Sequence, residues 1–133
     1  MRLWHQALIP YLPRQQLLGA HRECCGLRGK GWGKKHSVVD YVFTYPPEYL
    51  IAYHFLIMDE MKNRGYNPNT IWYNHKWRGN ILGEQSCWAR NCLVESILSK
   101  YEAGIHIFKE HNQEYLQECL DNLKSKGIII ERI

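Results

Sequence analysis

Arg22 and Glu23 form the first place in this sequence where residue types and spacing could do chemistry. A carboxylate beside a guanidinium suits a site that holds a phosphate or stabilises a developing positive charge. With about 100° between successive residues of a helix, both side chains fall on a polar arc that also contains Gly19 and Gly26. Each glycine inside a helix costs roughly 1 kcal/mol against alanine. We therefore expect something to pack close to this face, and the alternative is a solvated face with two tolerated glycines.

A basic, glycine-rich loop, residues 26–36, follows this face directly. Backbone amides freed by the glycines, together with cations and an indole, suit the binding of phosphates and a base. No G-x-x-x-x-G-K-[ST] pattern can be written through the loop, so it is not a nucleotide P-loop. A mobile, solvated loop is the alternative. The candidate residues for binding phosphate or nucleic acid are Arg2, Arg22, Arg28, Lys30, Trp32, Lys34 and Lys35.

Cysteines and histidines supply one pattern typical of a metal site. The residues with Cys2His2 zinc spacing are Cys87, Cys92, His106 and His111. On a helix over 86–101 the two cysteines would point about 140° apart. We therefore expect no metal there, and no other cofactor. Cys24 and Cys25 fall on the apolar arc of the first helix, where they favour packed thiols over nucleophiles.

The elements that position these residues are predicted to be helical. Apolar spacing predicts a first helix that begins near Pro13 and ends in the glycine-rich loop. Further helices are predicted over 46–64, over 86–101 and from an N-cap at Asn112. The opening segment is expected to be extended and partly buried. Residues 37–45 are expected to be extended or loosely helical, and 71–85 irregular. The expected fold is all-α, a compact single domain over residues 1–133 with three to four helices and long loops.

Composition limits the class of protein. Seventeen Lys and Arg against thirteen Asp and Glu give a net charge of +4, and their concentration between Arg22 and His36 indicates an anionic partner. Five cysteines are an odd number, no leader precedes the first helix, and no apolar run approaches the ~18 residues that span a membrane. We expect a reduced, cytoplasmic protein without membrane attachment. The nine tyrosines and five tryptophans, some of them beside cations, suit base stacking, although aromatic cores are commoner.

Read together, the opening residues and the first helix resemble the pyrimidine-dimer DNA glycosylase/endonuclease V family, small helical repair enzymes of bacteriophage with bacterial relatives. The resemblance covers residues 1–36. The matching residues, without gaps, are the opening Met-Arg-Leu-Trp, Leu8, Leu12, Gln15, Leu17, Arg22 and Glu23. It implies an all-helical fold whose N-terminal segment is threaded against helix one. It also implies that the terminal α-amine lies beside the glutamate, attacks C1′ of a flipped nucleotide and forms an imine, which leads to strand cleavage.

Carried over to this chain, the resemblance makes Met1 the amine nucleophile and Glu23 the group that moves protons and stabilises the sugar's charge. An α-amine titrates near ~7.7 to 8.0 and is a usable nucleophile at neutral pH. The phage-type enzyme exposes a threonine after removal of its methionine, whereas the bulky Arg2 is expected to keep Met1 in place.

Two functions follow from the sequence. The first is a DNA glycosylase and abasic-site lyase that acts on duplex DNA with a damaged or modified base. The second is a non-catalytic protein that sequesters a nucleotide or nucleic acid through Arg22 and the loop. The lesion, the oligomeric state, and a bacterial or phage origin remain open at this point.

Overall fold

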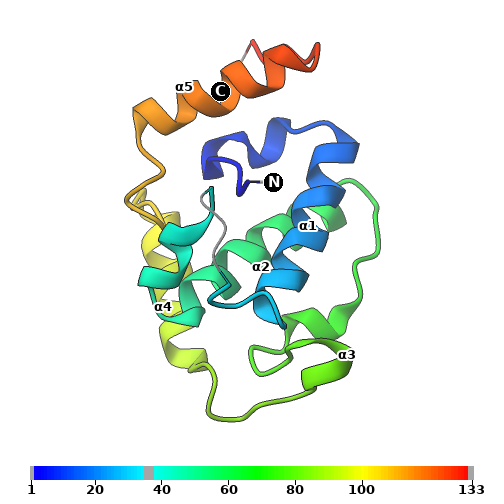
Figure 1. Cartoon of the computed structure of the whole chain (residues 1–133), viewed down its shortest axis with the longest axis vertical. Helices are drawn as coiled ribbons and strands as arrows, with labels where there is room; N and C mark the ends of the chain where they lie inside the picture. Colours follow the sequence, from blue (N-terminus) through cyan, green and yellow to red (C-terminus); the bar gives the residue numbers. More distant parts are fainter. Residues whose placement is uncertain (1, 35–37, 132–133) are drawn as a thin grey trace.

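Two crossing helices form the centre of the protein, shown in Figure 1 as a computed structural model. The structure describes residues 2–34 and 38–131, so the candidates Met1 and Lys35 lie outside the described residues. Helix α1, Arg14–Arg28, packs against α2, Pro47–Asn63. Both were predicted, and the structure confirms them to within a residue or two at each end.

Helix α1 begins and ends where its sequence requires. Pro13 occupies the N-cap, where the missing amide proton has no intrahelical partner to lose. At the other end the Gly29 amide donates to the carbonyls of Cys25 and Gly26, at 3.1 Å each. One face is buried, with Leu17, Cys24 and other apolar side chains against the core. The opposite face is left for the site.

Helix α2 is the most buried element. Pro47 stands at its N1 position, and Gly65, with φ of 84°, follows its C-cap. Apolar side chains are buried along its whole length, as expected of a helix that is packed on all sides. The other elements, among them α1, α4 (Asn91–Glu102), η1 (Gln6–Tyr11) and η2 (Asp40–Thr44), therefore pack around α2.

Two C-terminal helices complete the bundle. Helix α4, Asn91–Glu102, packs against α2. The prediction had placed its start at residue 86, but the helix begins at Asn91 because the buried carboxylate of Glu48 accepts the Arg90 amide at 2.9 Å and fixes the chain there. Helix α5, Gln113–Ser125, starts at the predicted N-cap, since the Asn112 side chain accepts from the Tyr115 amide at 2.9 Å.

The N-terminal segment runs between α5 and the central helices (Figure 1). Leu3 and Trp4 are buried. The Leu3 carbonyl accepts from the Tyr115 hydroxyl on α5, and the Trp4 carbonyl accepts from the Tyr53 hydroxyl on α2 at 2.6 Å. The segment is thus threaded through the fold. The prediction of an extended opening holds only for residues 2–5, since Gln6–Tyr11 form the 3-10 helix η1.

Short helical turns lie in the two segments that were expected to be extended or loosely helical, 37–45, and irregular, 71–85. The segments are η2, Asp40–Thr44, η3, Thr70–Tyr73, and α3, Gly79–Leu82. Among the described residues the only β pairing is the isolated bridge between Trp77 and Glu84. The all-α expectation is confirmed. Within the same residues, no helix is both long and apolar enough to cross a membrane.

Candidate active site

The outer face of α1 places a carboxylate between two glycines. Gly19, Glu23 and Gly26 follow one another at spacings of four and three residues, which places them on one face of the helix. A Cβ added at Gly26 would meet nothing within 4 Å, and one added at Gly19 would meet only the Arg22 guanidinium, at 3.8 Å. At these two glycines no described atom packs closely, contrary to the expectation of a close neighbour. The glycines instead leave room beside Glu23.

A groove of about 820 Å³ lies on the Gly19 side of Glu23. It is built from the N-terminal segment, α1, the start of the segment before η2, and the end of α5. We call it the glutamate groove. Its lining residues are Arg2, Trp4, Pro13, Gln15, Gln16, Gly19, Ala20, Glu23, Val38, Asn122, Lys126 and Ile128.

Cations and an unsatisfied amide line the glutamate groove together with the carboxylate. The Arg2 guanidinium carbon and the Lys126 ammonium lie 6.0 and 5.5 Å from the Trp4 ring. Arg2 Nη1 is 3.6 Å from a Glu118 carboxylate oxygen. Within the described residues, that nitrogen and the Asn122 side-chain oxygen are both buried without a hydrogen-bond partner. Buried polar atoms are normally satisfied, so these two atoms in the wall of the groove keep unused hydrogen-bonding capacity.

A second hollow, of about 380 Å³, lies on the Gly26 side of Glu23. We call it the α3 hollow, because α3 forms the wall that faces α1. Its lining residues are Glu23, Cys25, Gly26, Leu27, Gly29, Lys30, Gly31, Arg78, Gly79, Asn80, Ile81 and Leu82. Among the residues that the structure describes, Glu23 alone lines both spaces, so a ligand in either one lies beside this residue.

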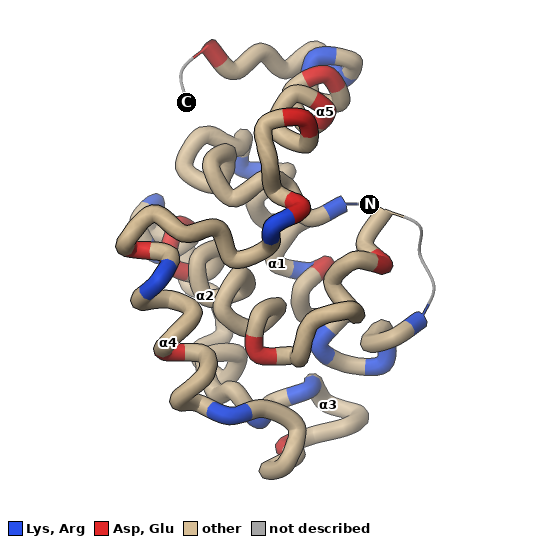
Figure 2. Tube along the Cα trace, turned by 90° about the vertical axis from the view of Figure 1, so that its left-hand side faces the viewer, with Lys and Arg blue, Asp and Glu red and all other residues tan. Residues whose placement is uncertain are grey.

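Positive charge gathers around these two spaces. Figure 2 shows Lys and Arg near the end of α1 and near α3. Arg22, Lys30 and Lys34 are exposed, as contact with phosphates requires. Trp32 is half-buried, with ring contacts at 5.0 Å to Phe43 and 6.0 Å to Trp88, so much of its indole surface is already covered.

Arg28 does not belong to this basic surface, which corrects the expectation that it binds phosphate. It is fully buried, and its guanidinium donates to the carbonyls of Trp72, Asn74 and Trp77 at 2.7, 2.9 and 3.1 Å. Burial lowers its pKa to about 10. Its role is to hold residues 72–77 against the end of α1.

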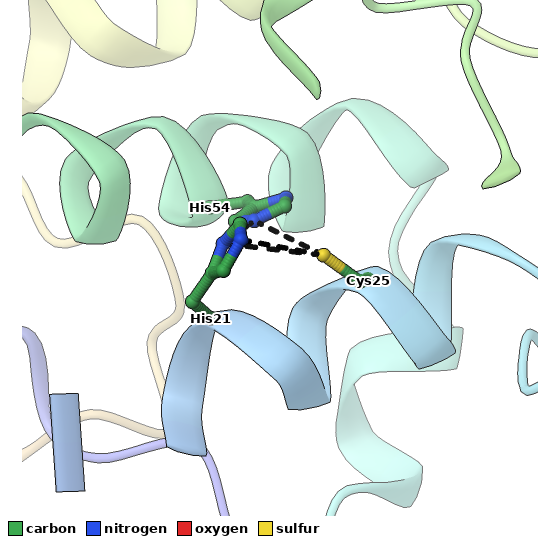
Figure 3. Close-up of side chains that lie close together, drawn as sticks. All are labelled: His21, Cys25 and His54. Atoms are coloured by element: carbon green, nitrogen blue, oxygen red, sulfur yellow. Dashed lines mark hydrogen bonds between the residues drawn. The ribbon is translucent and has the colours of Figure 1, made fainter. Parts of the chain in front are cut away.

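The inner face of α1 carries a second polar cluster, shown in Figure 3. His21 Nδ1 lies 2.8 Å from His54 Nε2 on α2, and Cys25 Sγ lies 3.8 to 3.9 Å from both rings. These are the one set of three ligand-type side chains within metal-binding distance among the residues described. The sequence missed this cluster, because it depends on how α1 meets α2.

Arg28 assigns the protons of this cluster. Arginine only donates, so the Arg28 Nη1 contact of 3.0 Å makes His54 Nδ1 an acceptor and leaves the ring proton on Nε2. That proton is donated to His21 Nδ1. A cation at Nε2 would need an imidazolate or the loss of the Arg28 contact, beside a buried positive charge. Burial, followed by nearby arginines, lowers the pKa of both histidines, and burial raises the pKa of Cys25 to about 11. The cluster therefore fits a set of neutral side chains that join α1 to α2 by hydrogen bonds better than it fits a metal centre.

The residues with zinc-finger spacing are not assembled. Cys87 and Cys92 are exposed, whereas His111 is fully buried. His111 Nδ1 accepts the Gln6 amide at 3.3 Å, and its Nε2 lies 2.7 Å from the Tyr41 hydroxyl. This histidine helps to fix the N-terminal segment under α5.

Comparison with known proteins decides the family. A sequence model described as pyrimidine dimer DNA glycosylase matches residues 1–74, more than half of the 133 residues. The chain belongs to the pyrimidine dimer DNA glycosylase family. The match extends the resemblance well beyond residue 36 and takes in all of α1 and α2. No curated protein and no solved structure matches the chain.

Family membership implies DNA as the substrate and glycosylase activity toward pyrimidine dimers as the class of reaction. In this glycosylase-family chain the matched region supplies Arg2, Trp4 and Glu23 to the glutamate groove. Asn122 and Lys126 come from the end of the chain, outside the match. Sequence reasoning missed both, because they are two polar residues among many at the end of an amphipathic helix and lie about a hundred residues from Glu23.

Proposed function

We propose that this protein removes a damaged pyrimidine from duplex DNA and then cleaves the abasic site, with the Met1 α-amine as nucleophile and Glu23 as proton carrier. The observation that supports this most is that Arg2, the residue after Met1, lines the same groove as Glu23 although 21 positions separate them. The terminal amine precedes Arg2 by one residue, which is at most ~3.6 Å of chain.

The reaction conserves atoms without a cofactor. The amine nitrogen bonds to C1′ while the bond from C1′ to the base breaks, and the base takes up a proton supplied through Glu23. In a cyclobutane dimer this base stays joined to the neighbouring pyrimidine. Opening of the sugar ring gives an imine. Loss of a proton from C2′ then breaks the bond from C3′ to oxygen, and the 3′ phosphate leaves. Water hydrolyses the remaining imine, which frees the amine and leaves an aldehyde on the sugar. The Glu23 carboxylate stabilises the positive charge on the sugar during the first step, and Arg2 and Lys126 attract the flanking phosphates.

Borohydride trapping tests the nucleophile. The protein is incubated with duplexes that contain a cyclobutane pyrimidine dimer or an abasic site, in the presence of borohydride, and the adduct is mapped by peptide mass. We expect it on the N-terminal peptide, because a primary amine forms a reducible imine. A variant with two extra glycines before Met1 moves the amine by up to ~7 Å, and we expect it not to trap. An adduct on Lys30 or Lys34 would contradict the assignment.

Salt dependence tests the partner. Each lysine that neutralises a DNA phosphate contributes about 0.9 to the slope of log affinity against log salt. We expect Lys30→Ala and Lys34→Ala each to reduce the slope for duplex DNA by about this amount. Lys100→Ala, at an exposed position of α4, serves as the matched control and should leave the slope unchanged. A shallow slope in the wild type, with tight binding of a mononucleotide, would favour the sequestering function instead.

A further inference from the structure

Ile81 is an exposed apolar side chain that lies outside the hydrophobic core. It is 75% exposed, the highest value among the large apolar residues that the structure describes as exposed. It lies on α3, a single turn bounded by Gly79 and Gly83, whose φ angles are 97° and 65°. These left-handed glycines make the chain turn sharply on both sides, so the turn projects Ile81 from the surface.

The turn that carries Ile81 is firmly attached to α1. Arg78 Nε donates to the Arg28 carbonyl at 2.8 Å, and Arg78 Nη2 donates to the Gly29 carbonyl at 3.1 Å. The Arg78 guanidinium also lies 4.3 Å from the centre of the Trp88 ring. From the other side, buried Arg28 holds the carbonyls of residues 72–77. Ile81 therefore has a fixed position relative to Glu23.

The position of Ile81 is next to the proposed chemistry. Ile81 and Glu23 line the same α3 hollow, and exposed Lys30 lines it as well. Gly26 belongs to the α1 wall of this hollow, with open space where its Cβ would be. An apolar tip beside a phosphate-binding cation and a carboxylate fits a duplex that approaches along this face.

We propose that Ile81 is a wedge that enters the base stack of duplex DNA at the lesion and covers the base faces that are exposed when the duplex opens there. The inference rests on the proposed function. Opening the duplex at a lesion breaks stacking and pairing, and an apolar side chain inserted between base steps offsets that loss by covering the exposed base faces. Because hydrogen bonds already attach the α3 turn to α1, binding of DNA does not have to order this turn.

The test compares two exposed isoleucines. Ile105 is 56% exposed, follows α4, and lines neither the glutamate groove nor the α3 hollow, so Ile105→Ala is the matched control. We expect Ile81→Ala to slow excision from dimer-containing duplex on the order of 10- to 100-fold, whereas cleavage of a duplex abasic site, where the base stack is already interrupted, changes much less. Ile81→Leu should restore most of the rate. Wild-type excision rates in Ile81→Ala would overturn the wedge.

A binding measurement separates failure of the wedge from failure of the proposed reaction. With Glu23→Gln as the background, no base is excised, and 2-aminopurine beside the lesion reports unstacking by increased fluorescence. We expect the increase when Ile81 is unchanged or carries the Ile81→Leu substitution, and its loss in Ile81→Ala. An increase in 2-aminopurine fluorescence, together with no borohydride adduct in the wild type, would contradict the proposed lyase reaction and support the wedge role of Ile81. Tight binding of the duplex without the increase would overturn the wedge alone.

Discussion

The two sides of α1 carry similar residue types and use them in opposite ways. On the inner side, His21 and Arg28 are tied to α2 and to residues 72–77 by hydrogen bonds that also assign the ring protons. On the outer side, Glu23 stands between two glycines and borders two open spaces. The difference teaches that residue type alone does not make an ionisable side chain a candidate for catalysis. The open space beside the side chain and the unsatisfied polar groups around it do.

The comparison is sharpest for two arginines six residues apart. Arg28 is buried and held by several hydrogen bonds, so its contribution is to stability. Arg22 is exposed beside Glu23 and remains accessible to a phosphate. Their sequence contexts, each within a basic and glycine-containing stretch, did not separate these roles.

The largest effect is expected on the outer side, from Glu23→Gln. Removing a general acid or base typically costs 10²- to 10⁴-fold in rate, and the loss here should appear in single-turnover excision of a dimer. Affinity for the duplex should change by a few fold at most, since the carboxylate acts mainly in the transition state. Glu102→Gln, at an exposed position at the end of α4, is the control. An unchanged excision rate in Glu23→Gln would mean that Glu23 has no catalytic role and that the outer face, like the inner one, is structural.

The inner side should respond through stability instead. Arg28→Met leaves three carbonyls and His54 without their donor, and an unsatisfied buried polar group costs about 1–3 kcal/mol. Because some of these groups can turn toward water, we expect a loss of roughly 3 kcal/mol in the free energy of unfolding. Urea denaturation followed by circular dichroism measures it. Arg22→Met should stay within about 0.5 kcal/mol of the wild type, and equal losses in both variants would erase the distinction between the two sides.

The sequence predicted the helices well because their apolar spacing and caps are local signals. The Asn112 cap and the proline starts of α1 and α2 are of this kind. It also selected Glu23 from its type and neighbours, and the structure places this residue beside both spaces, while its role in catalysis stays a prediction. It assigned Arg28 wrongly and missed His21 with His54, because both depend on which segment packs against α1. Asn122, Lys126 and Ile81 were missed for the same reason, since nothing local marks a residue that another segment brings to the groove or the hollow.

The pH dependence of stability is a further test of the inner side. Burial, followed by nearby positive charge, lowers the pKa of His21 and His54, so below about pH 6.5 the unfolded chain binds protons that the folded chain does not. As the pH falls, each histidine therefore lowers the free energy of unfolding by up to about 1.4 kcal/mol per pH unit. Above pH ~6.5 both histidines are neutral in the folded and the unfolded chain, and this loss is absent. His111, whose pKa burial lowers to about 3, adds to the same loss.

Urea denaturation between pH 7.5 and pH 5 measures this slope. His21→Gln should reduce the slope of the free energy of unfolding against pH by the equivalent of up to one bound proton. The substitution keeps a polar group near His54. If the slope in His21→Gln matches that of the wild type, His21 is charged in the folded protein, and the neutral chain of hydrogen bonds from Arg28 to His21 is wrong.

The smallest effect concerns two glycines at the end of α1 and in the loop that follows it. Gly26→Ala adds a methyl group where nothing lies within 4 Å, so the higher helix propensity of alanine should stabilise the fold by up to about 1 kcal/mol. Gly31→Ala places its Cβ only 2.7 Å from the Gly26 carbonyl oxygen, so the loop must shift and stability should fall. If the outer face receives DNA, Gly26→Ala should also weaken duplex binding despite the gain in stability, because the methyl group occupies the wall of the α3 hollow. A variant that is both more stable and fully active would show that the open space at Gly26 is unused.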